Sequence, residues 1–334
     1  MRKATKKTVI LITGSSGYIG SCCYKYFELK KKYNVFGVDK KKPYFKDQKN
    51  FIKKNISNYN NLKKIVKLVK PNIIIHLAGQ STIDGIKNKM KYKINNEIVT
   101  KNVVNVCNEF KISKLLFSST AAVYRSSKNK ITENSPIELK HIYSKTKMNC
   151  EISIRNKLNK DTNYIIFRFF NVCSSLFSLR VGELHNPETH LVPILVSKIL
   201  NNRKVHIYGN NYKTKDGTCV RDYLHILDLL NAFKISLHYL NRKKSGIFNL
   251  GASNGSTVLE MFNYTKKKLL KNEKLIKFEK RRNGDVPFLF CSNRKIQKRM
   301  KWKPNNSSVQ KIINDEIRWQ KYLKMRGIIK KNIY

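Results

Sequence analysis

Tyr143 and Lys147 are the pair whose residue types and spacing best suit proton transfer. A separation of four residues places two side chains on the same face of a helix. A free tyrosine has a pKa of ~10 and is a poor base at neutral pH, but a nearby ammonium group favours its phenolate form. Because both residue types are frequent in this chain, the pair carries weight only in combination with other motifs.

A run of hydroxyl side chains, Ser118-Ser119-Thr120, precedes the pair and ends an apolar stretch that we expect to be a strand. Open parallel sheets bind their ligands beyond the carboxyl ends of the strands. Thr120 is therefore placed to hydrogen-bond a substrate hydroxyl and to orient it. We predict that Thr120, Tyr143 and Lys147 are the catalytic residues.

A glycine loop near the N-terminus indicates a nucleotide cofactor. The apolar run Val9–Thr13 leads into Gly14-Ser15-Ser16-Gly17-Tyr18-Ile19-Gly20, with the spacing G-x2-G-x2-G. Glycines let the backbone approach a pyrophosphate, which the following helix N-terminus stabilises. Asp39 ends the next apolar run, 19 residues after Gly20, and a carboxylate there binds ribose hydroxyls and repels a 2′-phosphate. The pattern predicts NAD rather than NADP, a preference that Lys40–Lys42 weakens.

A bound nicotinamide would supply a second cation near Tyr143. Lowering the pKa of a tyrosine by ~3 units needs ~4 kcal/mol of differential stabilisation. We expect the Lys147 ammonium and the nicotinamide to supply this stabilisation in a water-poor cleft.

Short β-branched runs alternate with amphipathic segments in the first half of the chain. The expected strands are Thr8–Thr13, Asn34–Asp39, Asn72–Leu77, Leu115–Ser119 and Tyr164–Phe169. The expected helices lie near Gly17–Lys32, Tyr59–Lys70, Lys89–Phe110 and His141–Asn159. Since parallel strands need crossover connections, this alternation predicts an α/β fold with a doubly wound parallel sheet of the Rossmann type.

The pattern becomes irregular after Phe170, with longer loops and mixed elements. We therefore predict an NAD-binding domain over residues 1–170. A smaller α/β region over residues 171–334 would bind the substrate and return some segments to the first domain.

The chain of 334 residues carries 69 Lys and Arg against 21 Asp and Glu, a formal net charge of +48. Only 14 of these bases are Arg, the residue preferred for phosphate and base contacts, and the lysines are scattered through nearly every segment. We therefore interpret the charge as solvated surface and predict no specific nucleic-acid site. The apolar content of 41% argues against a disordered chain, and no run reaches the ~20 apolar residues of a membrane span.

The seven cysteines show no C-x2-C spacing and predict neither a disulfide framework nor a metal site. They are typical of small buried residues in a reducing compartment, so we expect a cytoplasmic protein.

Taken in order, these motifs and several others resemble the extended short-chain dehydrogenase/reductases, and among them the UDP-glucose 4-epimerase family. In the first half the matching motifs are Thr13–Gly20, Asp39, His76–Gly79, Ser118–Tyr124, Tyr143 with Lys147, and Arg168–Asn171. In the second half they are Pro187–Pro193, Tyr208–Tyr212, Asp216–His225, Phe248–Gly251 and Arg281–Asp285. The resemblance covers almost the whole chain, and the ordered set does not follow from fold alone.

The resemblance implies an NAD-dependent isomerase that interconverts UDP-glucose and UDP-galactose through a 4-keto sugar. Tyr143 would take the O4 proton while NAD takes the hydride from C4 and later returns it to the other face. The resemblance assigns cofactor binding to Gly14, Gly17, Tyr18, Ile19, Gly20, Asp39, Asn55, Ile56, Ala78, Asn96, Tyr143, Lys147 and Phe170. It assigns binding of the UDP-sugar to Thr120, Asn171, Leu191, Tyr208, Arg221, Arg282 and Asp285. It also implies a homodimer formed through the helices near residues 89–110 and 141–159.

These substrate roles agree with the chemistry of the side chains. Arg221 and Arg282 would neutralise a diphosphate, because the guanidinium presents a fixed fork of donors. Tyr208 would pack against the uracil, and Asp285 would accept a hydrogen bond from a ribose hydroxyl. A second set of polar residues is interpreted as structural: His76, Asp222, His225 and Asp228.

Four departures from the family pattern affect loops. Asn55 replaces a common Asp, Arg125 and Val99 replace Gly, and Ser174-Ser175 replace Gly-Ala. Because loss of Gly restricts the backbone, these loops are expected to run differently, with reduced activity or a shifted substrate as consequences.

Three alternatives remain open to different degrees. A 4,6-dehydratase is disfavoured, since Ala121-Ala122 follow Thr120 where that reaction needs an acid and a base. A 4-epimerase of UDP-N-acetylhexosamine or UDP-glucuronate stays possible, because Leu289 is intermediate in size at the position related to acetamido tolerance. A non-catalytic NAD-sensing or nucleic-acid-binding protein explains the charge but predicts loss of Tyr143, Lys147 or Thr120, and all three are present.

Overall fold

A computed structural model describes residues 7–44, 48–80, 89–242, 244–271, 274–282 and 284–328. The chain divides into two compact units. The first unit comprises Met1–Val123, Glu138–Arg168 and Phe233–Phe248. The second unit comprises Tyr124–Ile137, Phe169–Ala232 and Asn249–Tyr334. Residues 233–248 thus belong to the first unit, and residues 124–137 before the predicted boundary at residue 170 belong to the second.

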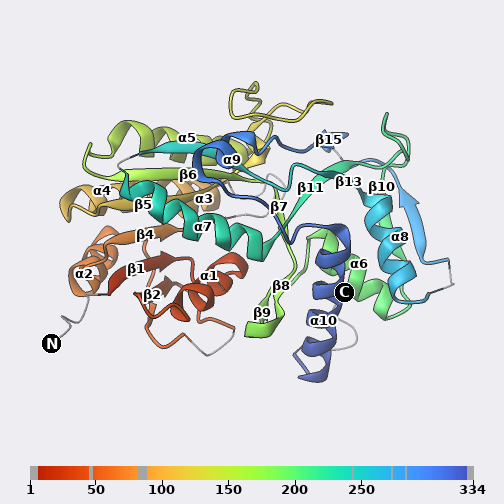
Figure 1. Ribbon diagram of the computed structural model, residues 1–334, viewed down its shortest axis with the longest axis horizontal. Coiled ribbons are helices and arrows are strands. Elements are labelled where there is room, and N and C mark those ends of the chain that lie inside the picture. The colour runs from red at the N-terminus through yellow and green to blue at the C-terminus, as the bar shows by residue number, and fades with distance from the viewer. Residues whose placement is uncertain are drawn as a thin grey trace. The chain divides into compact units, whose positions relative to one another are not determined.

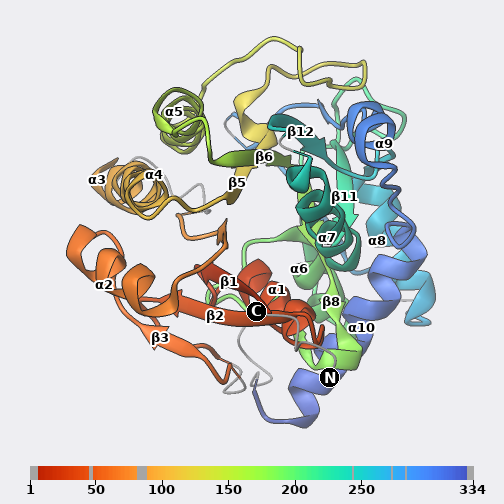
Figure 2. The same ribbon diagram turned by 60° about the vertical axis from the view of Figure 1, so that its left-hand side comes forward.

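The first unit is built on a seven-stranded sheet in the order β12-β6-β5-β4-β1-β2-β3. Figure 1 labels the five strands from β6 to β2, and Figure 2 labels β12 and β3 at the two edges. The strands of the sheet are β1 (Thr8–Thr13), β2 (Tyr33–Asp39), β3 (Phe51–Lys53), β4 (Ile73–His76), β5 (Lys114–Thr120), β6 (Asn163–Phe169) and β12 (Gly246–Leu250). β1 pairs in parallel with β2 and β4, and β4 pairs in parallel with β5. The predicted doubly wound parallel sheet is thus confirmed.

The strands form because their apolar runs are covered on both faces, as is typical of parallel sheets. Ile10, Leu11 and Ile12 of β1 have no exposed surface, and all of β4 is buried. The five expected strands are confirmed to within one residue at each end. β3 and β12 were not expected, since one is very short and the other lies far along the chain.

The helices of the first unit lie on both faces of the sheet, and the turned view in Figure 2 separates them. They are α1 (Tyr18–Glu28), α2 (Tyr59–Val69), α3 (Lys89–Tyr92), α4 (Val99–Glu109), α5 (Ile142–Lys157) and, from Phe233 onward, α7 (Ile226–Asn241), with a π-helical segment η1 (Lys93–Ile98) and a 3₁₀ turn η2 (Ala121–Val123). α4 packs against both α2 and α5 on one face, and α1 and α7 cover the other. On α7, the ring of Phe233 stacks on Phe167 of β6 with centroids 5.6 Å apart.

The strand order reverses at β1, whose neighbours β2 and β4 lead away in opposite directions. Thr13, the last residue of β1, pairs with Val38 of β2 and with His76 of β4. The loops that follow these strands therefore begin at the same edge of the sheet. Open α/β sheets bind ligands at such a reversal, beyond the carboxyl ends of the strands.

The second unit contains short strands and a helical layer. Its strands are β7 (Asn171–Cys173), β8 (Ser175–Leu176), β9 (Val181–Gly182), β10 (Val205–Tyr208), β11 (Val220–His225), β13 (Gly255–Thr257), β14 (Ile276–Glu279) and β15 (Phe288–Leu289). Its helices are α6 (Leu191–Leu200), α8 (Val258–Lys268), α9 (Arg294–Met300) and α10 (Val309–Met325), with a 3₁₀ turn η3 (Phe177–Leu179). β11 is the central strand, pairing with β13 and β15 along its first half and with β7 along its second.

α6, α8 and α10 pack against one another and enclose an apolar core. Leu195, Ile199, Met261, Ile312 and Ile313 of this core have no exposed surface. Among the described residues, no helix is both long enough and apolar enough to cross a membrane.

Candidate active site

The glycine loop after β1 requires glycine at two positions. Gly14 has a φ of +72°, in the left-handed region, and a Cβ there would lie 2.6 Å from the nitrogen of Ala78. A Cβ at Gly20 would lie 2.0 Å from the carbonyl oxygen of Gly14. Only glycines allow the loop to fold against both the start of α1 and the chain after β4.

The start of α1 presents backbone donors to this loop. Gly17 precedes the helix and, having no side chain, supplies no side-chain cap to the first N–H groups of α1. Tyr18 and Ile19 form the first residues of the helix, with Tyr18 buried and Ile19 half-buried. A helix N-terminus without a cap, next to a glycine turn, matches the requirements of a pyrophosphate.

Asp39 fixes the glycine loop to the end of β2. One carboxylate oxygen accepts a hydrogen bond from the backbone N–H of Ser16 at 3.1 Å, and the other accepts one from Lys41 at 3.0 Å. Each carboxylate oxygen has a further lone pair. The position and the remaining lone pairs fit the expected contact with ribose hydroxyls.

Asn55 and Ile56 lie between β3 and α2 in a connection stabilised by amide groups. The Asn55 side chain accepts the N–H of Ser57 at 3.0 Å. The backbone carbonyls of Ile56 and Ser57 both accept from the amide of Asn102, at 3.0 and 2.9 Å. The amide oxygen that replaces the common carboxylate at Asn55 is thus already engaged by its own loop.

The chain just after Ala78, together with Asn96 and Lys147, forms a close group drawn from the loop after β4, from η1 and from α5. A Cβ added at the neighbouring Gly79 would lie 2.9 Å from Oδ1 of Asn96 and 3.6 Å from Nζ of Lys147. Asn96 belongs to the π-helical segment η1, and its buried amide donates to Oγ1 of Thr146 at 3.0 Å. A π-helical turn re-aims side chains within a helix and is frequent at functional sites.

Tyr143 and Thr120 are hydrogen-bonded to each other, as expected for residues that share a substrate hydroxyl. Burial raises the pKa of Tyr143, whereas the hydrogen bond from Thr120 lowers it and the proximity of Tyr92 raises it further. The net direction is upward. The protein's own groups therefore keep Tyr143 protonated at neutral pH, and the lowering expected from Lys147 is not produced by the protein alone.

Lys147 points at the strand that carries Ser118-Ser119-Thr120. Its ammonium donates to the carbonyl oxygen of Ser118 at 2.5 Å and lies 4.6 Å from the centre of the Phe117 ring. Burial lowers the pKa of Lys147, and the proximity of Cys150 and Glu151 raises it. The net effect is a lowered pKa of Lys147. The ammonium is therefore fixed at the end of β5 and loses its proton more easily than a free lysine.

A buried network below these residues was missed in the sequence analysis. Glu151 forms a buried salt bridge with Arg168 at 2.7 Å and accepts a hydrogen bond from the hydroxyl of Ser119. Glu151 follows Lys147 by four residues, as Lys147 follows Tyr143, so all three lie on one face of α5. This i, i+4, i+8 spacing was the available signal, and the network fixes α5 against β5.

His76 is structural, as interpreted from the sequence. Its Nδ1 lies 2.7 Å from Oγ1 of Thr13 and its Nε2 lies 3.0 Å from Oγ1 of Thr100. Burial, with a smaller contribution from the charge of Lys147, lowers the pKa of His76 to about 3. A neutral imidazole thus joins β1, β4 and α4 behind the glycine loop.

In the second unit, the predicted UDP-sugar residues contact one another. Arg221 of β11 forms a salt bridge with Asp285, which also accepts the N–H of Val286 at 3.1 Å. The guanidinium of Arg282 lies 3.9 Å from the centre of the Tyr208 ring. Tyr208, expected to pack against uracil, therefore presents a face that binds planar groups.

The other predicted residues of the second unit lie at element ends. Asn171 begins β7 and donates to the carbonyl oxygen of Asp222 at 3.2 Å. Leu191 begins α6. Phe170, predicted to bind the cofactor, is buried, and its N–H donates to the carbonyl oxygen of Leu250 at 3.1 Å.

The structural interpretation of Asp222, His225 and Asp228 is confirmed. The buried carboxylate of Asp222 accepts N–H groups from Ala252 at 2.6 Å and Ser253 at 3.0 Å. Asp228 accepts from three consecutive residues, Asn305, Asn306 and Ser307. Nδ1 of His225 accepts the N–H of Leu227 at 3.1 Å.

The loop at Ser174 shows how this chain accommodates a lost glycine. Ser174 has a φ of +74°, in the left-handed region that glycine favours. Its hydroxyl donates to the carbonyl oxygen of Ile312 at 3.1 Å. The serine keeps a glycine-like conformation at a cost of ~1–2 kcal/mol, and a buried hydrogen bond offsets part of it.

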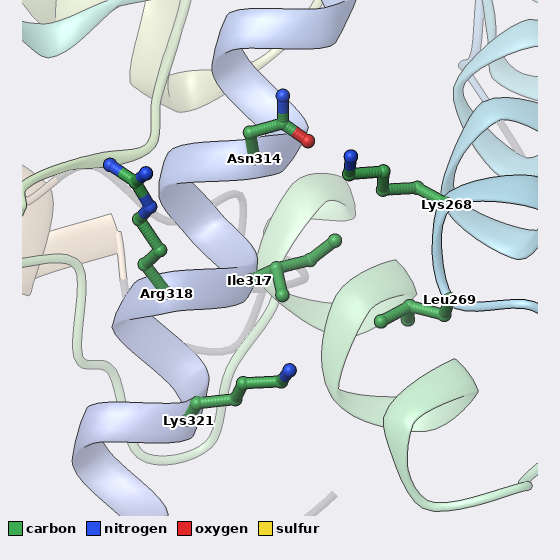
Figure 3. A pocket seen from close by; sticks show the side chains of 6 residues that line it. All are labelled: Lys268, Leu269, Asn314, Ile317, Arg318 and Lys321. Atoms are coloured by element: carbon green, nitrogen blue, oxygen red, sulfur yellow. The ribbon is translucent and has the colours of Figure 1, made fainter.

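A basic pocket is present between the end of α8 and α10, shown in Figure 3. Its lining residues are Lys268, Leu269, Asn314, Ile317, Arg318 and Lys321. The three cations are exposed on flexible stems, as expected for solvated surface charge. No predicted site residue is among the six.

The chain is similar to known proteins of one family. Residues 10–251 match the NAD dependent epimerase/dehydratase family. The UDP-glucose 4-epimerase of Lacticaseibacillus casei is 33% identical over 319 residues, covering 93% of this chain and 96% of the relative.

Solved structures of 4-epimerases have a similar fold. A crystal structure of UDP-glucose 4-epimerase superposes with a TM-score of 0.87 at 30% identity, covering 95% of this chain and 98% of that one. The UDP-Glc/GlcNAc 4-epimerase of Campylobacter jejuni superposes with a TM-score of 0.80 at 28% identity, covering 94% and 99%.

Proposed function

The chain belongs to the NAD-dependent epimerase/dehydratase family, and from this premise we propose that it interconverts UDP-glucose and UDP-galactose by epimerisation at C4. The observation that carries the proposal is the joint placement of Thr120, Tyr143 and Lys147 at the end of β5. The similarity to the UDP-glucose 4-epimerase of Lacticaseibacillus casei over 93% of the chain supports it.

NAD fits the residues of the first unit. The cradle at Gly14 and Gly20 has no room for a Cβ, Gly17 at the start of α1 supplies no side-chain cap, and Asp39 has free lone pairs. When bound, NAD accepts a hydride from C4 of the sugar and gives it back. We propose that Gly17, Tyr18, Ile19, Asn55, Ile56, Ala78 and Asn96 complete its binding site in this unit.

Tyr143 is the proposed base. It takes the proton from the C4 hydroxyl as C4 loses hydride, which leaves a 4-keto sugar, and it returns the proton to O4 when C4 regains hydride on the opposite face. Thr120 donates to the tyrosine oxygen and favours its phenolate. Since burial raises the pKa of Tyr143, the added positive charge of an oxidised nicotinamide is the contribution that the protein itself lacks.

Lys147 is proposed to serve two purposes. Its bond to the Ser118 carbonyl fixes the ammonium at the end of β5, and its charge favours the phenolate of Tyr143 during the reaction. Asn96 and Thr146 position the helix that carries both residues.

The second unit is proposed to bind the UDP portion. Arg221 and Arg282 would neutralise the diphosphate, Tyr208 would stack on uracil, and Asp285 would accept a ribose hydroxyl. We assign the remaining contacts to Asn171 and Leu191. Arg221 and Asp285 already pair with each other, so binding would exchange this contact for contacts to the nucleotide.

A panel of UDP-sugars tests the substrate. We expect the full-length chain to convert UDP-galactose faster than UDP-N-acetylgalactosamine or UDP-glucuronate. The N-acetyl substrate is the second candidate, because Leu289 of β15 is only half-buried and smaller than tyrosine, and because the Campylobacter relative is a UDP-Glc/GlcNAc 4-epimerase. Conversion of an alternative sugar alone would contradict the glucose/galactose assignment and retain the 4-epimerase chemistry.

A homodimer and a cytoplasmic location complete the proposal. Ile98 and Ile152, at the helices expected to form the dimer, are 37% and 44% exposed, which supports an interface there. Analytical ultracentrifugation would contradict this if the chain sediments as a monomer and Ile152→Asp changes nothing. All seven cysteines are buried thiols, which supports a reducing compartment.

A further inference from the structure

The segment between β9 and α6 carries four side chains that the proposed function does not use. Glu183, His185, Glu188 and His190 follow one another with the spacing E-x-H-x2-E-x-H. One ligand atom from each lies within 4.8 Å of the ligand atoms of the other three. All four belong to the second unit, so their arrangement is internal to one compact part of the molecule.

The distances within this cluster resemble those around a small metal ion. Nδ1 of His185 lies 3.1 Å from Oε1 of Glu183 and 3.7 Å from Oε1 of Glu188. Nδ1 of His190 lies 3.9 Å from Oε1 of Glu188 and in direct contact with Oε1 of Glu183. With bonds of ~2.0–2.2 Å, neighbouring ligands of a tetrahedral ion are ~3.3–3.6 Å apart. Small side-chain movements therefore suffice to place an ion among the four.

The two carboxylates leave buried oxygens without partners. The side chains of Glu183 and Glu188 have no exposed surface, and within the described part of the chain Oε2 of each makes no hydrogen bond. Oε1 of Glu188 accepts the N–H groups of Thr189 and His190, both at 2.8 Å, so the carboxylate is held in place from one side. A buried carboxylate oxygen without a partner is unfavourable, and a cation is the partner that satisfies it best.

The surroundings hold the cluster and balance its charge. The indole of Trp319 on α10 donates to the backbone oxygen of Glu183 at 2.7 Å. The buried Glu316 of the same helix lies near the two carboxylates and is hydrogen-bonded by the side chain of Gln320 at 2.8 Å. When an ion binds, the two imidazoles act as neutral ligands, and the two carboxylates supply the negative charge that balances one divalent cation.

We propose that Glu183, His185, Glu188 and His190 bind one divalent transition-metal ion, with Zn²⁺ as the best match. Two imidazole nitrogens and two carboxylate oxygens suit zinc, whereas magnesium and calcium prefer oxygen ligands alone. The site shares no residue with the proposed catalytic set and does not depend on the proposed function. Because α6 begins at Leu191, immediately after His190, the ion would fix the segment that leads into this helix.

Zinc binding by the full-length chain tests the site. After treatment with a chelator and its removal, titration calorimetry with ZnCl₂ alone should give one ion per chain. His185→Asn/His190→Asn should bind zinc more than ~100-fold more weakly, a larger loss than removal of an outer partner causes. Both histidines are partly exposed, at 32% and 44% of their side chains, so the variant is expected to fold.

A second variant and a matched control keep the test decisive. Glu188→Gln retains an oxygen for the N–H groups of Thr189 and His190 and should also weaken zinc binding. His206→Asn removes an exposed histidine that pairs with Glu279 at 2.8 Å and should leave zinc binding unchanged. Circular dichroism confirms folding of each variant.

Cobalt gives a spectroscopic check of geometry. Co²⁺ in the wild-type chain should show the intense visible absorption of a tetrahedral ion and lose it in the double histidine variant. The proposal is overturned if the wild type takes up no stoichiometric zinc, if both variants retain full affinity, or if His206→Asn abolishes binding. Binding of magnesium in preference to zinc would overturn the metal assignment.

Discussion

In the first unit, Tyr143, Lys147 and Asn96 are held by hydrogen bonds to hydroxyl and backbone groups, and these contacts lie within β5, η1 and α5. In the second unit, Arg221 is paired with Asp285, and Arg282 lies on the ring of Tyr208. There the predicted binding residues contact each other. The first arrangement fixes reactive groups before substrate arrives, whereas the second must exchange partners when a ligand binds.

This difference predicts that the first unit mainly determines turnover and that the second mainly determines affinity for the substrate. A preorganised proton-transfer group acts only on the transition state, so its loss lowers kcat. An arginine that trades a carboxylate for a diphosphate acts on ground state and transition state alike, so its loss raises KM. Substitutions in the two units should therefore have different kinetic signatures.

Tyr143→Phe should cause the largest loss. Removal of the phenol leaves no base for the C4 hydroxyl, and we expect kcat to fall by ~10³-fold, within the usual range for a general acid–base group. NAD content, measured after denaturation of the purified variant, should stay at the wild-type level because the glycine loop is untouched. Unchanged turnover would refute the role of Tyr143.

Arg221→Ala should raise KM for UDP-glucose by ~10–100-fold, the equivalent of one or two charge-assisted hydrogen bonds. The value of kcat should change less, and steady-state kinetics separates the two. Arg281→Ala is the matched control: Arg281 lies over Tyr212 and bonds to Asn211 but has no proposed substrate role. An equal increase of KM in both variants would mean that the effect of Arg221 is only general surface charge.

His76 should make the folded state sensitive to acid. Its pKa is about 3 in the folded chain and ~6.5 when unfolded. Below the unfolded value only the unfolded chain takes up the proton, so the free energy of unfolding falls as pH drops. Between pH 6.5 and 5 the loss is ~2 kcal/mol.

Urea unfolding at several pH values compares the wild type with His76→Gln. The variant is expected to be less stable at pH 8 but to lack this acid-dependent loss. A loss of the same size in His76→Gln would show that another group is responsible.

Thr120→Val should produce the smallest effect, seen in the pH profile. The hydrogen bond from Thr120 lowers the pKa of Tyr143, so its removal raises that pKa and moves the rise of kcat to higher pH by up to ~1 unit. Thr120→Ser retains the hydroxyl and should restore the wild-type profile. If the rise of kcat in Thr120→Val stays at the wild-type pH, or moves to lower pH, the proposed effect of Thr120 on the pKa of Tyr143 is contradicted.

The sequence predicted the first unit well because its information is local. β1, β2, β4, β5 and β6 are continuous apolar runs, and the glycine loop, Asp39, Thr120 and the Tyr143/Lys147 pair lie at their ends. The π-helical turn that aims Asn96 has no comparable sequence signal. The raised pKa of Tyr143 could not be predicted from the sequence either. It results mainly from burial of the side chain, and burial depends on packing that residue spacing does not reveal.

The second unit was less predictable because its contacts join distant residues. Arg221 and Asp285 are 64 positions apart, and strands such as β8 and β9 have only two residues each. The cluster at Glu183–His190 was overlooked for a different reason. Cysteine spacing carries no information about this cluster, whose pattern is two Glu-x-His pairs in one short segment.

The most direct test of the proposed reaction follows a deuterium atom at C4. The purified chain, with no added cofactor, is incubated with UDP-galactose carrying deuterium at C4, and the products are analysed by NMR and mass spectrometry. We expect UDP-glucose with the deuterium still at C4, because the same hydride leaves and returns. Absence of interconversion while NAD is bound, or loss of the label to water, would contradict the account.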